Sequence, residues 1–244
     1  MTFNLSPSMG AVSVQRLTKP YVAGGGGSLA PAFLDSDSQF QIDGVGTPTA
    51  VNTLTTTNGC TIVTAAFGDL SRFSAPTDNK GNGSYTSRGT SGYAGGLWPG
   101  FGLNLFAKAN ALGGASHIIT VTKSNPTTYE FSLLSVAVAG TTIEDSSIVA
   151  RAFNQAQVSA SVTVTGPARL VAVWGGDAGV NDNPKDTAPV GVEWTMHESL
   201  FLNDEAYIQA AIATREVDIG THTVTWTQPN ASQGAILALL AVRP

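Results

Sequence analysis

One stretch, residues 158–175, limits most strongly what this chain can fold into. From Val158 to Thr165 apolar and hydroxyl residues alternate at every position, which is the period of a strand buried on one face. Gly166-Pro167 then interrupts the pattern, and Arg169 to Trp174 resumes it with apolar residues on both faces, as in a strand covered by protein on two sides. A half-exposed strand that leads into a fully covered one predicts two stacked β-sheets.

Short β-type segments separated by turn residues run through most of the chain, with no convincing alternation of strands and helices. Asn58-Gly59 predicts a hairpin between Thr53–Thr57 and Cys60–Phe67. Residues 143–157 fit either a strand or a short helix that Asp145-Ser146 would cap. The other expected strands are Leu103–Ala109, His117–Thr122, Tyr129–Val138, Glu193–Leu202, Thr221–Thr227 and Ala235–Val242. The predicted fold class is therefore all-β: an antiparallel two-sheet β-sandwich, jelly-roll or immunoglobulin-like, over residues 47–244.

Residues 1–46 differ from the rest and are expected to form an extended N-terminal arm. Gly24 to Ser28 is a flexible hinge, and Leu29 to Asp43 lacks a sustained period. The same pentapeptide also fits an artificial linker, which would make residues 1–23 foreign. The alternative that we favour is an arm that docks on a neighbouring subunit and becomes ordered there.

Composition narrows the environment and the partners. The single cysteine, Cys60, excludes a disulfide within the chain, and neither a signal peptide nor a membrane span is evident, so we expect a protein made in the cytoplasm with no membrane insertion. Charged residues make up 12% of the 244 residues, about half of the usual share, and the net charge is −5. Such a surface suits contacts with copies of itself, whereas nucleic acid is an unfavourable partner.

Three sets of residues, in this order along residues 50–244, resemble a β-sandwich module of bacteriophage virion proteins and bacterial surface proteins. The first is the turn Pro76 to Asn82 with Tyr85 close behind it. The second is Leu105 to Lys108, followed by a glycine-containing turn and Thr120-Val121-Thr122. The third is the ending Gly220 to Trp226, then Asn230 to Ser232, then Ala235 to Arg243-Pro244.

The resemblance implies a function and settles one ambiguous segment. In the module the segment before the last glycine-started strand is itself a strand, so we expect a strand over part of Asn203 to Glu216 despite its helical spacing. The implied function is a non-enzymatic virion protein, assembled in the host cytoplasm and exposed as a fibre, tail or capsid-decoration subunit. Residues 1–46 would attach it to other virion proteins, and the sandwich would form a homo-oligomer, such as a trimer. The glycine-rich segment 87–102 and the arm depart from the module.

No motif for catalysis, metal or cofactor binding stands out, so we expect none of the three. His117, His197 and His222 lie in separate predicted strands, and no two have metal-ligand spacing. No nucleophile elbow supports a Ser-His-Asp triad, and the acidic residues Asp177, Asp182, Glu193 and Glu198 have no spacing that favours glycoside hydrolysis. The oxygens of Asp78, Asn79 and Asn82 could bind calcium, although turn formation explains the same residues.

Three aromatic residues in a glycine-rich segment suggest an alternative function. Tyr85, Tyr93 and Trp98 could stack on sugar rings, which would make the protein an adhesin that recognises a host surface glycan in host attachment, or less plausibly a glycan hydrolase. The structural alternative is that these rings pin the segment to the rim of the core.

Overall fold

The computed structural model describes residues 29–41, 49–70, 73–92, 101–123, 131–151, 157–177, 188–200, 208–227 and 234–244. Within this part the chain is all-β, every strand pair is antiparallel, and no helix is long and apolar enough to cross a membrane. The strands are β1 (Phe33–Gln41), β2 (Thr49–Leu54), β3 (Cys60–Asp69), β4 (Thr77–Asp78), β5 (Thr86–Gly92), β6 (Phe101–Ala111), β7 (His117–Thr122), β8 (Phe131–Val138), β9 (Thr142–Arg151), β10 (Gln157–Val164), β11 (Ala168–Asp177), β12 (Ala188–Pro189), β13 (Thr195–Leu200), β14 (Ile208–Val217), β15 (Gly220–Thr227) and β16 (Ala235–Arg243).

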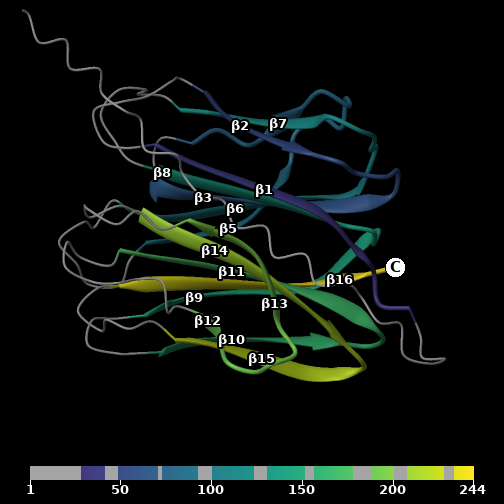
Figure 1. The fold of residues 1–244 in the computed structure, drawn as a ribbon, viewed down its shortest axis with the longest axis vertical. Coiled ribbons are helices and arrows are strands. Elements are labelled where there is room, and N and C mark those ends of the chain that lie inside the picture. The colour runs from purple at the N-terminus through teal and green to yellow at the C-terminus, as the bar shows by residue number, and fades with distance from the viewer. Residues whose placement is uncertain are drawn as a thin grey trace, which may run out of the picture.

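These strands form four sheets, which lie in layers in Figure 1. The two inner sheets have five strands each, in the orders β1-β8-β3-β6-β5 and β9-β16-β11-β14-β13, and the two outer sheets have three each, β2-β7-β4 and β10-β15-β12. Strands β1–β8, called the first unit below, make one inner and one outer sheet. Strands β9–β16, the second unit, repeat the same order with every strand number raised by eight.

Hydrophobic cores fill each space between neighbouring layers. The central core joins the two inner sheets, with residues such as Phe67 and Leu105 from the first unit and Val173 and Ile212 from the second. A second core, which includes the stacked rings of Trp174 and Trp226, lies between the sheets of the second unit. Two smaller clusters lie between the sheets of the first unit. The inner sheets are therefore covered on both faces, which explains the unbroken apolar sequence of β11 and β16.

The stretch at residues 158–175 forms the predicted pair of strands. β10 alternates between exposed and buried residues along its whole length, while residues 168–176 of β11 are buried without exception. The two strands lie in different sheets, so the prediction of a half-exposed strand leading into a covered one is confirmed.

The structure corrects the predicted hairpin and shows strands in the two segments that also fitted a helix. The hairpin prediction is wrong: β2 pairs with β7, whereas β3 pairs with β6 and β8. Gly59, with φ +79°, does turn the chain, but Leu54 and Ile62 then enter the same core cluster from opposite sheets. The ambiguous residues 143–157 contain a strand, β9, and the strand expected within residues 203–216 is present as β14.

Part of the segment assigned to the N-terminal arm belongs to a sheet. The described residues 29–41 contain β1, which pairs with β8 at the edge of an inner sheet. Residues 1–28 and 42–48, including the Gly24–Ser28 stretch, lie outside the described residues. The attachment role of residues 1–46 stays a prediction.

Candidate functional site

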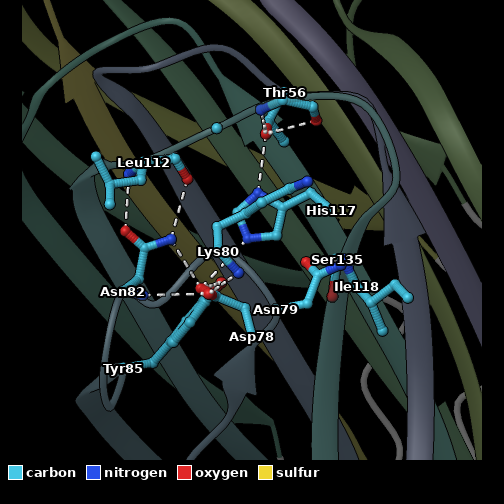
Figure 2. Close-up of polar contacts among 12 residues, drawn as sticks. Thr56, Asp78, Asn79, Lys80, Asn82, Tyr85, Leu112, His117, Ile118 and Ser135 are labelled. Carbon is cyan, nitrogen blue, oxygen red and sulfur yellow. Dashed lines mark hydrogen bonds and ion pairs between the residues drawn. The ribbon is translucent and has the colours of Figure 1, made fainter.

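A polar network surrounds the buried side chain of Asp78, in the turn from Pro76 to Asn82 (Figure 2). Asp78 ends β4, and its Oδ1 accepts hydrogen bonds from the backbone N–H groups of Lys80 at 2.9 Å and Asn82 at 3.2 Å. This is the local bonding expected of an aspartate that starts a turn. Gly81 and Gly83, with φ of +79° and +68°, supply the left-handed backbone that such a turn requires.

The second carboxylate oxygen of Asp78, Oδ2, contacts three neighbouring side chains. Asn82 Nδ2 donates to Oδ2 at 2.9 Å, the Tyr85 hydroxyl donates at 3.0 Å, and His117 Nε2 lies 3.2 Å away. Burial by itself would raise the pKa of Asp78, but the hydrogen bonds from Asn82, His117 and Lys80 outweigh burial and lower it. Burial, together with the charge of Asp78, raises the pKa of Tyr85. Asp78 is therefore a carboxylate at neutral pH, and Tyr85 is a phenol that donates to it.

His117 connects Asp78 to Thr56, which gives the order hydroxyl, imidazole, carboxylate. Its Nδ1 lies 2.8 Å from Thr56 Oγ1, and Thr56 in turn bonds the backbone of Gly114. In serine hydrolases Nδ1 faces the carboxylate and Nε2 faces the hydroxyl, so the ring here has the opposite orientation. The side chains of His117 and Asp78 are 0% exposed, and Thr56 is buried as well. This geometry supports cross-bracing of three loops rather than attack on a substrate.

The amides of Asn79 and Asn82 are also used within the protein. The Asn79 side chain bridges Ser116 O and Ile118 N, at 2.9 Å each, and the Asn82 side chain bridges Leu112 O at 3.0 Å and Leu112 N at 2.7 Å. Their oxygens thus accept backbone N–H groups, and turn formation explains the three residues without calcium. No group of three or more His, Cys, Asp or Glu side chains suited to a metal occurs among the described residues.

The other two histidines lie apart from this network. His197 stacks on Phe33 with ring centroids 3.7 Å apart, and its Nε2 lies 2.8 Å from Thr214 Oγ1. Burial first, and then the charge of Arg169, lowers the pKa of His197 to about 4. His222 Nε2 lies 2.7 Å from the carbonyl oxygen of Asp218.

The acidic residues weighed for glycoside hydrolysis are engaged elsewhere or fall outside the described side chains. Glu193 pairs with Arg215 at 3.0 Å. Glu198 is buried and accepts hydrogen bonds from Ser36 and Ser38, at 2.6 and 2.7 Å. Asp182 and the side chain of Asp177 are not among the described residues.

Of the three aromatic residues considered for sugar stacking, the structure describes one. Tyr85 is 3% exposed and belongs to a core cluster, so its ring faces are covered, in line with the alternative that it pins the segment to the core. Tyr93 and Trp98 lie outside the described residues. The described residues therefore do not bring the three rings together.

Lys123 is a buried cation that the sequence patterns above do not single out. It is 5% exposed, its ammonium donates to Gln41 Oε1, and the Phe131 ring centroid lies 4.3 Å from Nζ. Burial lowers its pKa to about 8. The signal in the sequence is the alternation of His117, Ile119 and Val121, which continues to Lys123 and places it on the inward face.

Comparisons of the chain with protein-family models, with curated proteins and with solved structures gave no match in any of the three.

Proposed function

We propose that the protein is a structural subunit of a bacteriophage particle, exposed on it as a fibre, tail or head-decoration protein, and that each eight-strand unit is a jelly roll. The strand order supports the assignment to the jelly-roll fold. Each unit has eight antiparallel strands divided between two facing sheets, and strands that are distant in the sequence lie side by side, as in that architecture. The proposed function is supported by the sequence resemblance and by the uncharged outward face of the described outer strands β10 and β15.

The observation that carries the proposal is that the carboxylates of Asp78 and Glu198 are buried, while the outward face of the described strands β10 and β15 carries no charged residue. The carboxylates of Asp78 and Glu198 accept hydrogen bonds from neighbouring side chains and are shielded from solvent. The outward face of β10 and β15, by contrast, is a ladder of paired hydroxyls: Ser159 with Thr225 at 2.9 Å, Ser161 with Thr223 at 2.7 Å, and Thr163 with Thr221 at 2.9 Å. An uncharged face of paired hydroxyls lets neighbouring subunits approach without charge repulsion or a large desolvation cost.

The connections differ between the two ends of the sheets, which suggests which end is exposed on the particle. The odd-numbered strands of each inner sheet run in one direction, because each is antiparallel to the even-numbered strand beside it. Short connections, such as residues 139–141 and 165–167, lie at the end where the odd-numbered strands begin. The strand ends that flank the longer connections lie on the left in Figure 1 for both units. Longer connections tolerate variation and commonly carry recognition, so we assign this end to the outside.

Incorporation into particles tests the proposal. An antibody against the purified full-length protein is expected to label particles from an infected culture in immuno-electron microscopy. Abundant protein in the lysate with unlabelled, protein-free particles would contradict a structural role in the virion.

The attachment role needs a truncation that spares the sheet. Deleting residues 1–46 would remove β1, whereas deleting residues 1–28 leaves β1 and its pairing with β8 in place. The shorter deletion is expected to fold with unchanged thermal stability and to be lost from the particles. If it is incorporated like the intact chain, residues 1–28 are not the anchor, although the virion proposal itself would stand.

A further inference from the structure

The two eight-strand units match residue by residue, not only in strand order. Val63 in β3 lies between Ala107 of β6 and Val136 of β8, and Val171 in β11 lies between Thr214 of β14 and Leu240 of β16. Bulges also recur in corresponding edge strands: one follows Phe33 in β1 and one follows Ile143 in β9, and a second pair interrupts β5 and β13. The register therefore assigns each residue of β3 a counterpart in β11.

A specific side-chain contact recurs at the first of these bulges. Asp35 in β1 accepts the backbone N–H of Ser36 at 3.0 Å and that of Thr55 at 2.7 Å. Asp145 in β9 accepts the N–H of Ser146 at 2.8 Å and that of Thr163 at 2.8 Å. Asp35 and Asp145 are therefore corresponding carboxylates, and each links the inner sheet of its unit to the outer strand or the residue that follows it.

The central core is made by corresponding faces of the two units. Val63, Ala65 and Phe67 of β3 point into it, and so do Val171 and Val173 of β11. The edges correspond as well, since β1 of the first unit contacts β13 of the second, and β9 of the second contacts β5 of the first. Packing of like face on like face is the arrangement of a symmetric dimer, here within one chain.

One pair of corresponding positions breaks this symmetry at the centre. Phe67 corresponds to Gly175, because both stand two residues before the final aspartate of their strands. A Cβ atom built on Gly175 would lie 2.1 Å from Phe67 Cε1, so the ring of one unit occupies the space that a side chain of the other would need. Gly175 does not have a left-handed backbone conformation, and the absence of a side chain there is a matter of space.

We infer that the inner sheet of each unit is an interaction surface whose partner is the other unit of the same chain, and that Phe67 and Gly175 make this pairing selective. Two first units placed face to face would bring two Phe67 rings into one space. Two second units would face each other with a glycine on both sides and leave a void. Only the mixed pair fills the centre at the density of a protein core.

Exchange of the two residues in the full-length chain tests the inference. Gly175→Phe alone overlaps Phe67, and Phe67→Gly alone leaves a cavity, so each is expected to lower the melting temperature by about 10 °C or more. The double variant Phe67→Gly with Gly175→Phe moves the ring to the corresponding position of the other unit, and it is expected to recover more than half of the loss. If Gly175→Phe alone does not fold, recovery of folded protein in the double variant gives the same support.

The neighbouring pair Ala66 and Trp174 provides the matched control. These residues also correspond, but they point away from the central core into separate clusters. Ala66→Trp and Trp174→Ala are therefore expected to be additive, with no recovery in the double variant. A Phe67/Gly175 double variant no more stable than the sum of its single variants would overturn the inference.

Discussion

Asp78 is a buried carboxylate that the fold keeps charged, and this ties stability to pH. Its pKa in the folded protein is below the value of 3.8 for a free side chain. A lowered pKa contributes stability above the unfolded value, and this contribution is lost as pH falls through the folded value. We therefore expect Asp78→Asn to be destabilised at pH 7 and the difference from the unsubstituted protein to shrink as pH falls below 4.

Urea unfolding at several pH values between 2 and 7 measures this effect. Asp218→Asn is a suitable control, because Asp218 is exposed and uses only its backbone carbonyl to meet His222. A stability difference between Asp78→Asn and the unsubstituted protein that stays constant across the whole range would contradict the role assigned to the carboxylate.

Lys123 predicts a second rise of stability with pH, in the alkaline range. Its pKa is about 8 in the folded protein and 10.5 for a free side chain, so between these values the unfolded chain binds more protons and stability rises with pH. Lys123→Met keeps the apolar contact with Phe131 and removes the titrating group. We expect the gain in stability between pH 8 and 10 to disappear in Lys123→Met and to persist in Lys108→Met. Equal gains in all three proteins would show that burial of Lys123 does not set the slope.

The two bulge aspartates, Asp35 and Asp145, make the same hydrogen bonds in the two units, which allows a paired prediction. Asp35 and Asp145 make corresponding hydrogen bonds to the N–H groups of Thr55 and Thr163. A hydrogen bond to a charged group contributes about 1.5 to 3 kcal/mol, so Asp35→Ala and Asp145→Ala are each expected to lose this amount of stability. Chemical denaturation measures both, with Asp218→Ala as the exposed control. A large loss in one variant and none in the other would mean that the two contacts differ in energy despite their geometry.

Many individual strands could be predicted from the sequence because their period is local. Alternation placed β10 and β15, and continuous apolar runs placed β11 and β16. Pairing is a long-range property, and the hairpin at Asn58-Gly59 failed because a turn dipeptide does not say which sheet receives the next strand. The repeat had weak signals, such as Asp35-Ser36 with Asp145-Ser146, and Gly68-Asp69 with Gly176-Asp177. These short matches can be recognised as a repeat only when the strand register of the structure places the two units in alignment.

The candidate site was predictable in part. The turn of Pro76 to Asn82 was identified from residue types that favour turns. The hydrogen bond from the Lys80 N–H to Asp78 Oδ1 within it joins residues only two positions apart. Its partners are distant in the sequence, because Thr56 follows β2 and His117 begins β7, so no sequence spacing connects them with Asp78. At the position that corresponds to Thr56 the second unit has Val164, which is buried in an apolar core. The hydroxyl group of the network therefore has no counterpart at this described position of the second unit.

The central core makes the two units depend on each other, which predicts a single unfolding transition. Each inner sheet has one face in its own unit and one face on the partner unit, so loss of either unit would expose the central core of the other. The chain offers separate probes for the two units. The Cys60 thiol is buried in the first unit, whereas Trp174, Trp194 and Trp226 lie in the second.

Thiol labelling and tryptophan fluorescence across a urea series test this coupling in a Trp98→Phe background, in which the remaining tryptophans all belong to the second unit. Burial shields Cys60 and raises the pKa of its thiol, so labelling requires the first unit to open. We expect the two midpoints to coincide in this protein, because opening one unit removes the cover of the other. Phe67→Gly weakens the central contact and is expected to separate the midpoints. Full labelling of Cys60 at a urea concentration where tryptophan fluorescence is still native, without that substitution, would show that the units unfold independently.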